Sequence, residues 1–239
     1  MMTRQLRARS HWLVAFALLA NACAKSQTAA SESASATAAF TAAAPRVEAR
    51  AAHERVGVLA PGTGIPVGQS VPDVRGVDLN GRATALASIY EKSPVLLVFY
   101  REGWCPYCNR EIHALSMAYP EFQKRGVTPV AMSVDMPEAD SLSQATYTIP
   151  FPVLSDTSAE SLLSFHVVNP ADAAQIEHAK SPRVNVEQNS AQSHHEIAIP
   201  ALFLIDRTGV VRWAHSDPEY KVRPSTAELL AAIDELHLS

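Results

Sequence analysis

The chain has 239 residues, of which 47% are hydrophobic and 18% are charged, and its formal net charge is −4. This composition supports a folded core and excludes a fully disordered chain, while the mildly acidic charge argues against a general nucleic-acid-binding protein. The three cysteines are too few for a disulfide-rich scaffold. The length fits one medium-sized domain with additional segments.

The first 22 residues have the pattern of a secretory signal peptide. Three arginines precede a short apolar run, residues 12–20, which is not long enough to span a membrane. Ala20-Asn21-Ala22 forms an A-x-A cleavage site, after which the mature chain would begin at Cys23. We therefore expect an exported protein of the bacterial periplasm.

Cys23 would stand where bacterial lipoproteins carry their lipid-bearing cysteine. The residues before it match a lipobox only in part, because Leu19 stands one place early and Asn21 is unusual there. A lipid anchor at Cys23 and a plain exported chain are therefore the two alternatives. Residues 23–64 follow as an Ala/Ser-rich stretch with little apolar surface to bury, which predicts a linker.

The remaining chain, residues 65–239, has the pattern of one domain in which strands and helices alternate. Residues 74–79 and 82–86 flank Asn80-Gly81, a turn signal typical of a β-hairpin in which both turn residues adopt positive φ. The sequence therefore predicts that the domain begins with a hairpin.

A continuous apolar run follows at residues 95–100 (VLLVFY), as expected of a strand buried on both faces. A helix is expected over residues 106–125, ending at Gly126. Five residues are expected to form its inner surface: Ile112, Leu115, Met117, Tyr119 and Phe122.

Shorter strands and helices continue the alternation toward the C-terminus. The strands are expected at 130–134, 151–154, 201–205 and 210–214, and the helices at 138–145 and 159–165. Residues 167–196 interrupt this order with a polar stretch that is expected to be a functional or disordered loop. Ser225 is expected to cap a last amphipathic helix. The order predicts an α/β fold with a mixed central sheet flanked by helices and extended by the hairpin.

Cys105 and Cys108 form a C-x-x-C directly after the first buried strand. Gly103 opens a sharp turn and Pro106 suits the first turn of a helix, so Cys105 is expected at the helix N-terminus. Unpaired backbone N–H groups and the positive end of the helix dipole favour a thiolate there. Cys108 lies one turn later, within reach of a disulfide. The pattern predicts attack by Cys105 and resolution of the mixed disulfide by Cys108.

Three alternatives to a redox role of the cysteine pair stay open. Buried, inert thiols are the least expected of them, because Pro106 and Tyr107 stand between the cysteines and the pair lies at a helix start. A zinc site normally needs four ligands, and only His194 and His195 could complete one with the pair. A stable structural disulfide would make the chain an envelope binding module without enzymatic activity. Short C-x-x-C loops at the start of a helix are typical of redox proteins, so no metal and no other cofactor is expected.

Four segments of the domain carry a family resemblance: FYREGWCPYCNRE (99–111), SVD (133–135), FPVLSD (151–156) and IPALFLIDRTG (199–209). Together they resemble the peroxiredoxin-like branch of the alkyl hydroperoxide reductase/thiol-specific antioxidant (AhpC/TSA) family within the thioredoxin superfamily. The resemblance implies a thioredoxin-like fold and a thiol-dependent, antioxidant oxidoreductase. Its substrates would be peroxides or protein or small-molecule disulfides, and an external thiol would regenerate it.

The chain departs from the peroxiredoxins that it resembles at two positions. Their motif P-x-x-x-T-x-x-C, aligned on Phe99-Tyr100, puts their threonine on Cys105 and their peroxide-reducing cysteine on Cys108. Their arginine three residues before the Phe of F-I-I-D falls on Pro200, where thioredoxins have a cis-proline. The resemblance therefore implies either disulfide exchange through Cys105 or peroxide reduction with Cys108 as the primary thiol.

The residues expected to support the cysteine pair are Glu102, Trp104, Pro106, Tyr107 and Pro200. Trp104 is expected to shield the thiol, and Glu102 is a candidate proton acceptor for the resolving thiol. The buried aspartate that thioredoxins place six residues before the first cysteine is replaced by Phe99. Tyr220 and Arg223 resemble a Y-x-x-R near the C-terminus of the family, to which the sequence assigns no role.

Overall fold

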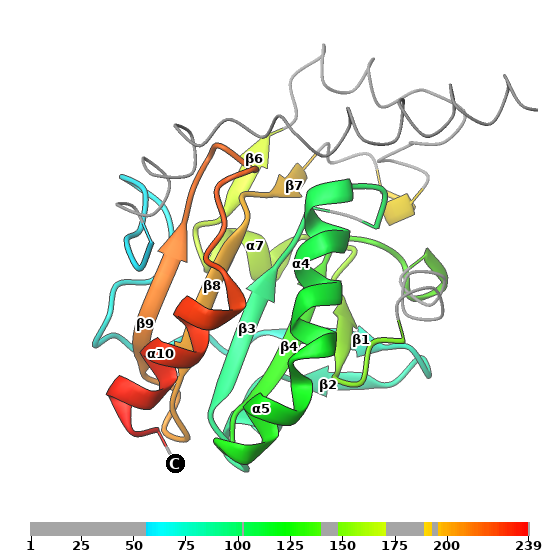
Figure 1. Ribbon diagram of the computed structural model, residues 1–239. Helices are drawn as coiled ribbons and strands as arrows, with labels where there is room; N and C mark the ends of the chain where they lie inside the picture. Colours follow the sequence, from blue (N-terminus) through cyan, green and yellow to red (C-terminus); the bar gives the residue numbers. More distant parts are fainter. Residues whose placement is uncertain (1–55, 102, 140–147, 171–188, 193–195, 239) are drawn as a thin grey trace, which may run out of the picture. The chain divides into compact units, whose positions relative to one another are not determined.

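A seven-stranded mixed sheet forms the centre of the computed structural model, with strands in the order β2-β1-β5-β4-β3-β8-β9 (Figure 1). The structure describes residues 56–101, 103–139, 148–170, 189–192 and 196–238, all within one compact unit, Ala49–Ser239. The expected signal peptide, Cys23 and most of the expected linker lie outside the described residues. Within the described part, no helix has the length and apolar character of a membrane span.

The sheet is parallel at its centre and antiparallel toward its edges. Its strands are β1 (Arg75–Asp78), β2 (Ala83–Ala85), β3 (Val95–Phe99), β4 (Thr128–Ser133), β5 (Val153–Ser155), β8 (Ala201–Ile205) and β9 (Val211–Ser216). β3 and β5 pair in parallel with β4, whereas β8 pairs antiparallel with β3 and β9, and β1 pairs antiparallel with β5. The mixed sheet expected from the sequence is therefore confirmed.

Helices cover both faces of the sheet. Four longer helices are α4 (Pro106–Met117), α5 (Tyr119–Lys124), α7 (Glu160–Ser164) and α10 (Thr226–Leu236), and α3 is a single turn, Ala87–Tyr90. Leu96 and Val98 of β3 pack in the apolar cluster of α4, α5 and α10, whereas Leu97 and Phe99 face the cluster that contains α7. Figure 1 shows α4 and α10 on the near face and α7 behind the sheet. All of β3 is buried, as its apolar run predicts.

The single long helix expected after the cysteine pair is wrong, because the chain breaks at Ala118, which has φ −90° and ψ 2°. Pro120 follows in the first turn of α5. It has no N–H for the carbonyl of Ser116, and its ring would clash with that carbonyl in a continuous helix. Met117 is 72% exposed, which contradicts its expected inner position, because two residues after the buried Leu115 it lies on the opposite side of α4. Gly126, with φ 66°, ends α5 as expected.

The N-terminal hairpin is confirmed, but its turn differs from the expected one. Gly81 has φ 77°, whereas Asn80 does not adopt positive φ. The Gly81 N–H donates to the Asp78 carbonyl at 2.9 Å, and Asp78 Oδ1 accepts from the N–H groups of Asn80 and Arg82. The aspartate therefore holds a type I turn followed by one glycine in the left-handed region, which is the common three-residue hairpin loop.

The polar stretch expected to be a functional or disordered loop, residues 167–196, contains a strand at its start, and a second strand begins at its last residue. β6 (Val168–Pro170) and β7 (Glu196–Ala198) pair antiparallel in a separate two-stranded sheet. The helix expected at 138–145 is helical over residues 137–139, and its remainder lies outside the described residues. His194 and His195 lie outside them as well. The described residues hold no group of three side chains suited to bind a metal.

The last helix begins as the sequence predicts. Ser225 Oγ accepts from the Glu228 N–H at 3.3 Å, and the Ser225 N–H donates to Glu228 Oε2 at 2.6 Å. This reciprocal capping box satisfies two N–H groups that the helix itself leaves unpaired. The cap fixes where α10 starts and therefore also fixes the end of the segment between β9 and α10.

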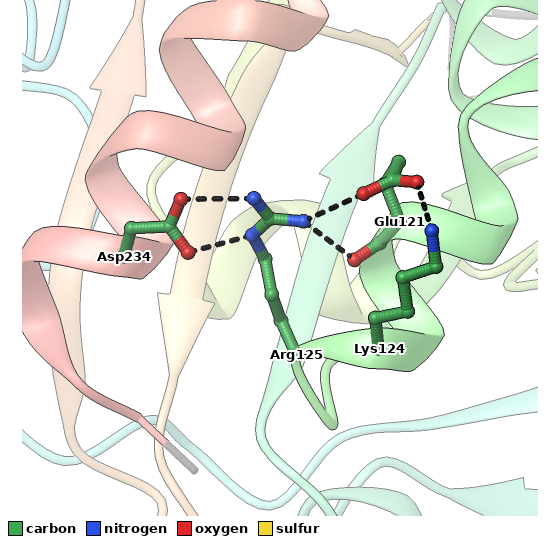
Figure 2. A network of polar contacts seen from close by, with 4 residues as sticks. All are labelled: Glu121, Lys124, Arg125 and Asp234. Carbon is green, nitrogen blue, oxygen red and sulfur yellow. Dashed lines mark hydrogen bonds and ion pairs between the residues drawn. The ribbon is translucent and has the colours of Figure 1, made fainter.

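Arg125, which follows α5, joins α5 to α10 through ion pairs (Figure 2). Arg125 Nε and Nη2 donate to the two carboxylate oxygens of Asp234 at 2.6 and 2.9 Å. Its Nη1 donates to Glu121 Oε2 at 3.1 Å, and Lys124 Nζ donates to Glu121 Oε1 at 2.6 Å. Because these groups lie at the surface, salt screens them, and their contribution is to orientation more than to stability.

Candidate active site

The cysteine pair lies where β3 passes into α4. Cys105 is the N-cap of α4 with extended backbone, φ −77° and ψ 114°, and Pro106 is the first helical residue, as the sequence predicts. The turn before it is held from two sides. The Gly103 N–H donates to Asp135 Oδ2 at 2.7 Å, and Asn109 Nδ2 donates to the Gly103 carbonyl at 2.7 Å. The end of β4 and the first turn of α4 therefore fix the position of the first thiol.

Both cysteines are unbonded thiols and both are buried. A hydrogen bond from the Cys108 S–H lowers the pKa of Cys105 to about 6, and the N–H groups of residues 107 and 108 and the charge of Arg101 act in the same direction against burial. The same hydrogen bond, together with burial, raises the pKa of Cys108 well above its ordinary value. The pair therefore holds one thiolate, on Cys105, and one thiol, on Cys108.

A buried ion pair adjoins Cys108. Arg223, from the segment between β9 and α10, places Nη2 at 3.5 Å from Cys108 Sγ, and its Nη1 donates to Glu111 Oε2 at 2.7 Å. The two side chains are only 10% and 6% exposed. Burial raises the pKa of Glu111, and Arg223 opposes that shift. Glu111 was not predicted from the sequence as a site residue. An acidic residue among the apolar residues on the inner face of an amphipathic helix is a signal that could have identified it.

Aromatic rings surround the turn before Cys105. The guanidinium of Arg101 lies 5.1 Å from the centre of the Trp104 ring and 4.8 Å from that of Tyr220. Tyr220 also meets Tyr107 edge-on, with ring centres 5.4 Å apart. Trp104 and Tyr107 are half-buried and pack against the cluster that contains both cysteines. One tyrosine of the C-terminal segment thus joins residues on either side of the first cysteine.

Pro200 lies at the same edge of the sheet as the turn. It is buried and directly precedes β8, whose first residue, Ala201, is paired with Phe99 of β3. Its carbonyl accepts from the Asp217 N–H at 3.4 Å. Of the expected supporting residues, Trp104, Pro106 and Tyr107 therefore lie beside the cysteines, and Pro200 lies at the edge of the sheet where the cysteine-bearing turn begins. Glu102 lies outside the described residues.

Two hollows open beside the first turns of α4. One, of about 340 Å³, is lined by Trp104, Pro106, Asn109, Arg110 and His113. The other, of about 400 Å³, lies between α4 and the start of α10, and its polar lining includes Arg110, Glu111, Lys221 and Arg223. Each offers apolar and charged groups to a ligand near the cysteine pair.

Comparison with known proteins identifies relatives of the domain. Residues 67–214 match the AhpC/TSA family. The thiol-disulfide oxidoreductase ResA of Geobacillus thermodenitrificans is 32% identical over 106 residues, which are 44% of this chain and 60% of that protein. The chloroplastic peroxiredoxin Q of Populus jackii is 30% identical over 89 residues, 37% of this chain and 41% of the relative. The chain therefore spans less than two thirds of the length of either relative.

Solved structures share the fold. BcpB of Mycobacterium tuberculosis, described as a peroxidoxin, superposes with a TM-score of 0.55 at 19% identity over 72% of this chain and 96% of that one. A peroxiredoxin-like protein from Aquifex aeolicus gives a TM-score of 0.57 at 19% identity over 73% and 90%. The thioredoxin-like fold expected from the sequence is confirmed.

Proposed function

Since the chain belongs to the AhpC/TSA family, which matches residues 67–214, we propose that it is an oxidoreductase that cycles Cys105 and Cys108 between dithiol and disulfide. The observation that carries this proposal is the hydrogen bond from the Cys108 thiol, which lowers the pKa of Cys105 to about 6. At neutral pH the first cysteine is then a thiolate, the form that attacks disulfides, and the second is a protonated neighbour.

The geometry supports a complete disulfide-exchange cycle. The Cys105 thiolate attacks one sulfur of a substrate disulfide, and the other sulfur leaves as a thiolate that takes a proton. Cys108 then loses its proton and attacks the sulfur of Cys105, so that the substrate's second sulfur leaves and a Cys105–Cys108 disulfide forms. An external thiol reductant returns the pair to the dithiol. Two protein thiols are oxidised for each substrate disulfide that is reduced.

Peroxide reduction is the second candidate, and the position of Arg223, 3.5 Å from Cys108 Sγ, favours it. In that reaction a Cys108 thiolate attacks a peroxide oxygen, the O–O bond breaks, and water or an alcohol leaves. The sulfenic acid formed on Cys108 then reacts with Cys105, giving the disulfide and water. The resting pair opposes this order, because its charge lies on Cys105.

Two serine variants distinguish the reactions. Under disulfide exchange, Cys108→Ser accumulates a stable mixed disulfide through Cys105, because nothing resolves it. Under peroxide reduction, Cys105→Ser still reacts rapidly with hydrogen peroxide and gives a sulfenic acid on Cys108. Mass spectrometry of the alkylated proteins detects both adducts. A slow peroxide reaction in both variants eliminates the peroxidase, and a Cys108→Ser protein without an adduct eliminates the exchange.

The reduction potential tests the enzyme against the binding module with a structural disulfide. A value of about −120 to −270 mV is typical of catalytic pairs, whereas one below about −300 mV is typical of structural bonds. Equilibration of the wild-type pair with glutathione buffers measures it. A pair that stays oxidised in the most reducing buffer contradicts the catalytic cycle.

We further propose that the chain is exported to the periplasm and carries a lipid on Cys23. The charged start, the short apolar run and the cleavage site before this cysteine support it. Cells grown with labelled palmitate are expected to label the wild-type chain and not Cys23→Ser, and globomycin is expected to block processing. An unlabelled wild-type chain would contradict the lipid on Cys23 and would leave only the proposal that the chain is exported.

A further inference from the structure

Stability alone does not explain the buried ion pair between Arg223 and Glu111. The two residues lie 112 positions apart in the sequence, and both side chains are at least nine-tenths buried. A buried ion pair costs desolvation that its attraction seldom exceeds, so its presence is weak evidence for stability. Its one described contact with a reacting atom is the hydrogen bond from Arg223 Nη2 to Cys108 Sγ.

When the two cysteines are reduced, Cys108 is protonated, so Arg223 has no thiolate to stabilise there. The second cysteine keeps its proton because it donates to Cys105, because it is buried, and because the Cys105 charge repels a second negative charge. The first and last of these influences depend on a thiolate at Cys105. Once Cys105 is bonded to a substrate sulfur, the acceptor and the repelling charge are gone. Burial then still opposes a thiolate at Cys108, while the positive charge of Arg223 and the backbone N–H of Arg101 favour it.

We propose that Arg223 stabilises the thiolate of Cys108 during its attack on the mixed disulfide at Cys105, and that Glu111 positions Arg223 for this step. The assignment rests on the proposed dithiol cycle. The Cys108 S–H gives its proton to solvent, a bond forms between the two cysteine sulfurs, and the substrate sulfur leaves as a thiolate. Arg223 carries charge and transfers no proton, since guanidinium stays protonated in proteins.

The surroundings of the pair single out Arg223 among the nearby groups. In the described part, the other charged or titratable side chains around the cysteines include Arg101, Tyr107, Arg110, Asp135, Tyr220 and Lys221. The charge of Arg101 acts on Cys105, its guanidinium lies against Trp104 and Tyr220, and its backbone N–H rather than its side chain acts on Cys108. Glu111 Oε2 holds Arg223, while its buried Oε1 has no hydrogen-bond partner within the described part. Glu111 therefore acts through the arginine.

A two-step reaction with Ellman's reagent tests the assignment in a Cys23→Ser background, which removes the third thiol. Attack by Cys105 releases the first thionitrobenzoate, and attack by Cys108 on the resulting mixed disulfide releases the second. We expect Arg223→Met to slow the second release at least about threefold at neutral pH. Loss of a nearby opposite charge raises the pKa of a thiol by about one or more, which lowers the thiolate fraction about tenfold, and the higher nucleophilicity of the remaining thiolate offsets about half of that loss on a logarithmic scale. The first release should change less than about 1.5-fold, and Arg223→Lys should be intermediate.

Lys221→Met is the matched control, since it removes a cation of the same segment that contacts Tyr220 and has no described contact with Cys108. The double variant Glu111→Gln/Arg223→Met removes both buried charges, so it folds without an unpaired carboxylate. We expect it to resolve as slowly as Arg223→Met. Equal second-release rates in Arg223→Met, the double variant and wild type overturn the assignment.

A direct titration separates this assignment from the dithiol cycle. In Cys105→Ser, the thiolate absorbance of Cys108 reports its pKa without the first cysteine. Adding Arg223→Met should raise that pKa by about one or more, and an unchanged pKa overturns the assignment. A wild-type protein that releases only one thionitrobenzoate contradicts the cycle instead, and the titration still decides the role of Arg223.

Discussion

Cys108→Ala is expected to raise the pKa of Cys105 by about one or more. The hydrogen bond from the Cys108 thiol is the largest of the influences that bring this pKa to about 6, and alanine cannot donate it. The N–H groups at the start of α4 and the charge of Arg101 still act to lower the pKa. Burial opposes them, so the pKa moves toward the ordinary value.

The thiolate absorbance of the reduced protein, followed across acidic to basic pH in a Cys23→Ser background, measures this pKa. Near pH 6 about half of the wild-type Cys105 is ionised, and a pKa higher by about one lowers this fraction to about a tenth. Asn109→Ala is a control that alters the turn through Gly103 without touching the donated S–H. A pKa that stays near 6 in Cys108→Ala would show that the helix N-terminus and Arg101 ionise Cys105 without the Cys108 thiol.

The same lowered pKa makes the stability of the reduced protein depend on pH. The pKa of Cys105 is about 6 when folded and near the ordinary 9.0 when unfolded, so between these values the unfolded chain binds the extra proton. Stability from this group is therefore present above the unfolded value and is lost as the pH falls through about 6. The oxidised protein has no thiol at this position and should lack this dependence.

Local sequence signals were sufficient for the elements that position Cys105. The apolar run of β3, Gly103 and Pro106 each specify their own conformation, and together they place the first cysteine at a helix start. The Asn80-Gly81 signal predicted the hairpin but not its turn, because a side chain outside the dipeptide, Asp78, decides the turn type. Local patterns therefore fix an element more reliably than its backbone detail.

The contacts that depend on tertiary structure could not be predicted from the sequence. Arg223 and Glu111 meet across 112 positions, and no periodicity links a residue after β9 to one in α4. The break at Ala118 is different, because Pro120 was a local signal that the apolar spacing masked. In the sequence, Tyr220 stood out only as part of a recurring Y-x-x-R. In the structure its ring contacts the guanidinium of Arg101, beside the first cysteine.

Phe203→Ala is expected to lower the free energy of unfolding by about 3 to 5 kcal/mol, a large share of the stability of a domain. Phe203 of β8, Phe99 of β3 and Phe165 at the end of α7 are fully buried and form a cluster with ring centres 5.0 to 6.1 Å apart. Removing one ring leaves a cavity between the sheet and α7 that its neighbours fill only in part. Urea denaturation of the reduced protein measures the loss.

Phe203→Leu keeps most of the volume and should cost about 1 to 2 kcal/mol. Met117→Ala, at a side chain 72% exposed, is the surface control and should stay within about 0.5 kcal/mol. Because the cysteines pack on the opposite face of the sheet from Phe203, the pKa of Cys105 should not move. A loss in Phe203→Ala no larger than in Met117→Ala contradicts the packing of this layer, whereas a changed pKa shows that the α7 layer also positions the active-site turn.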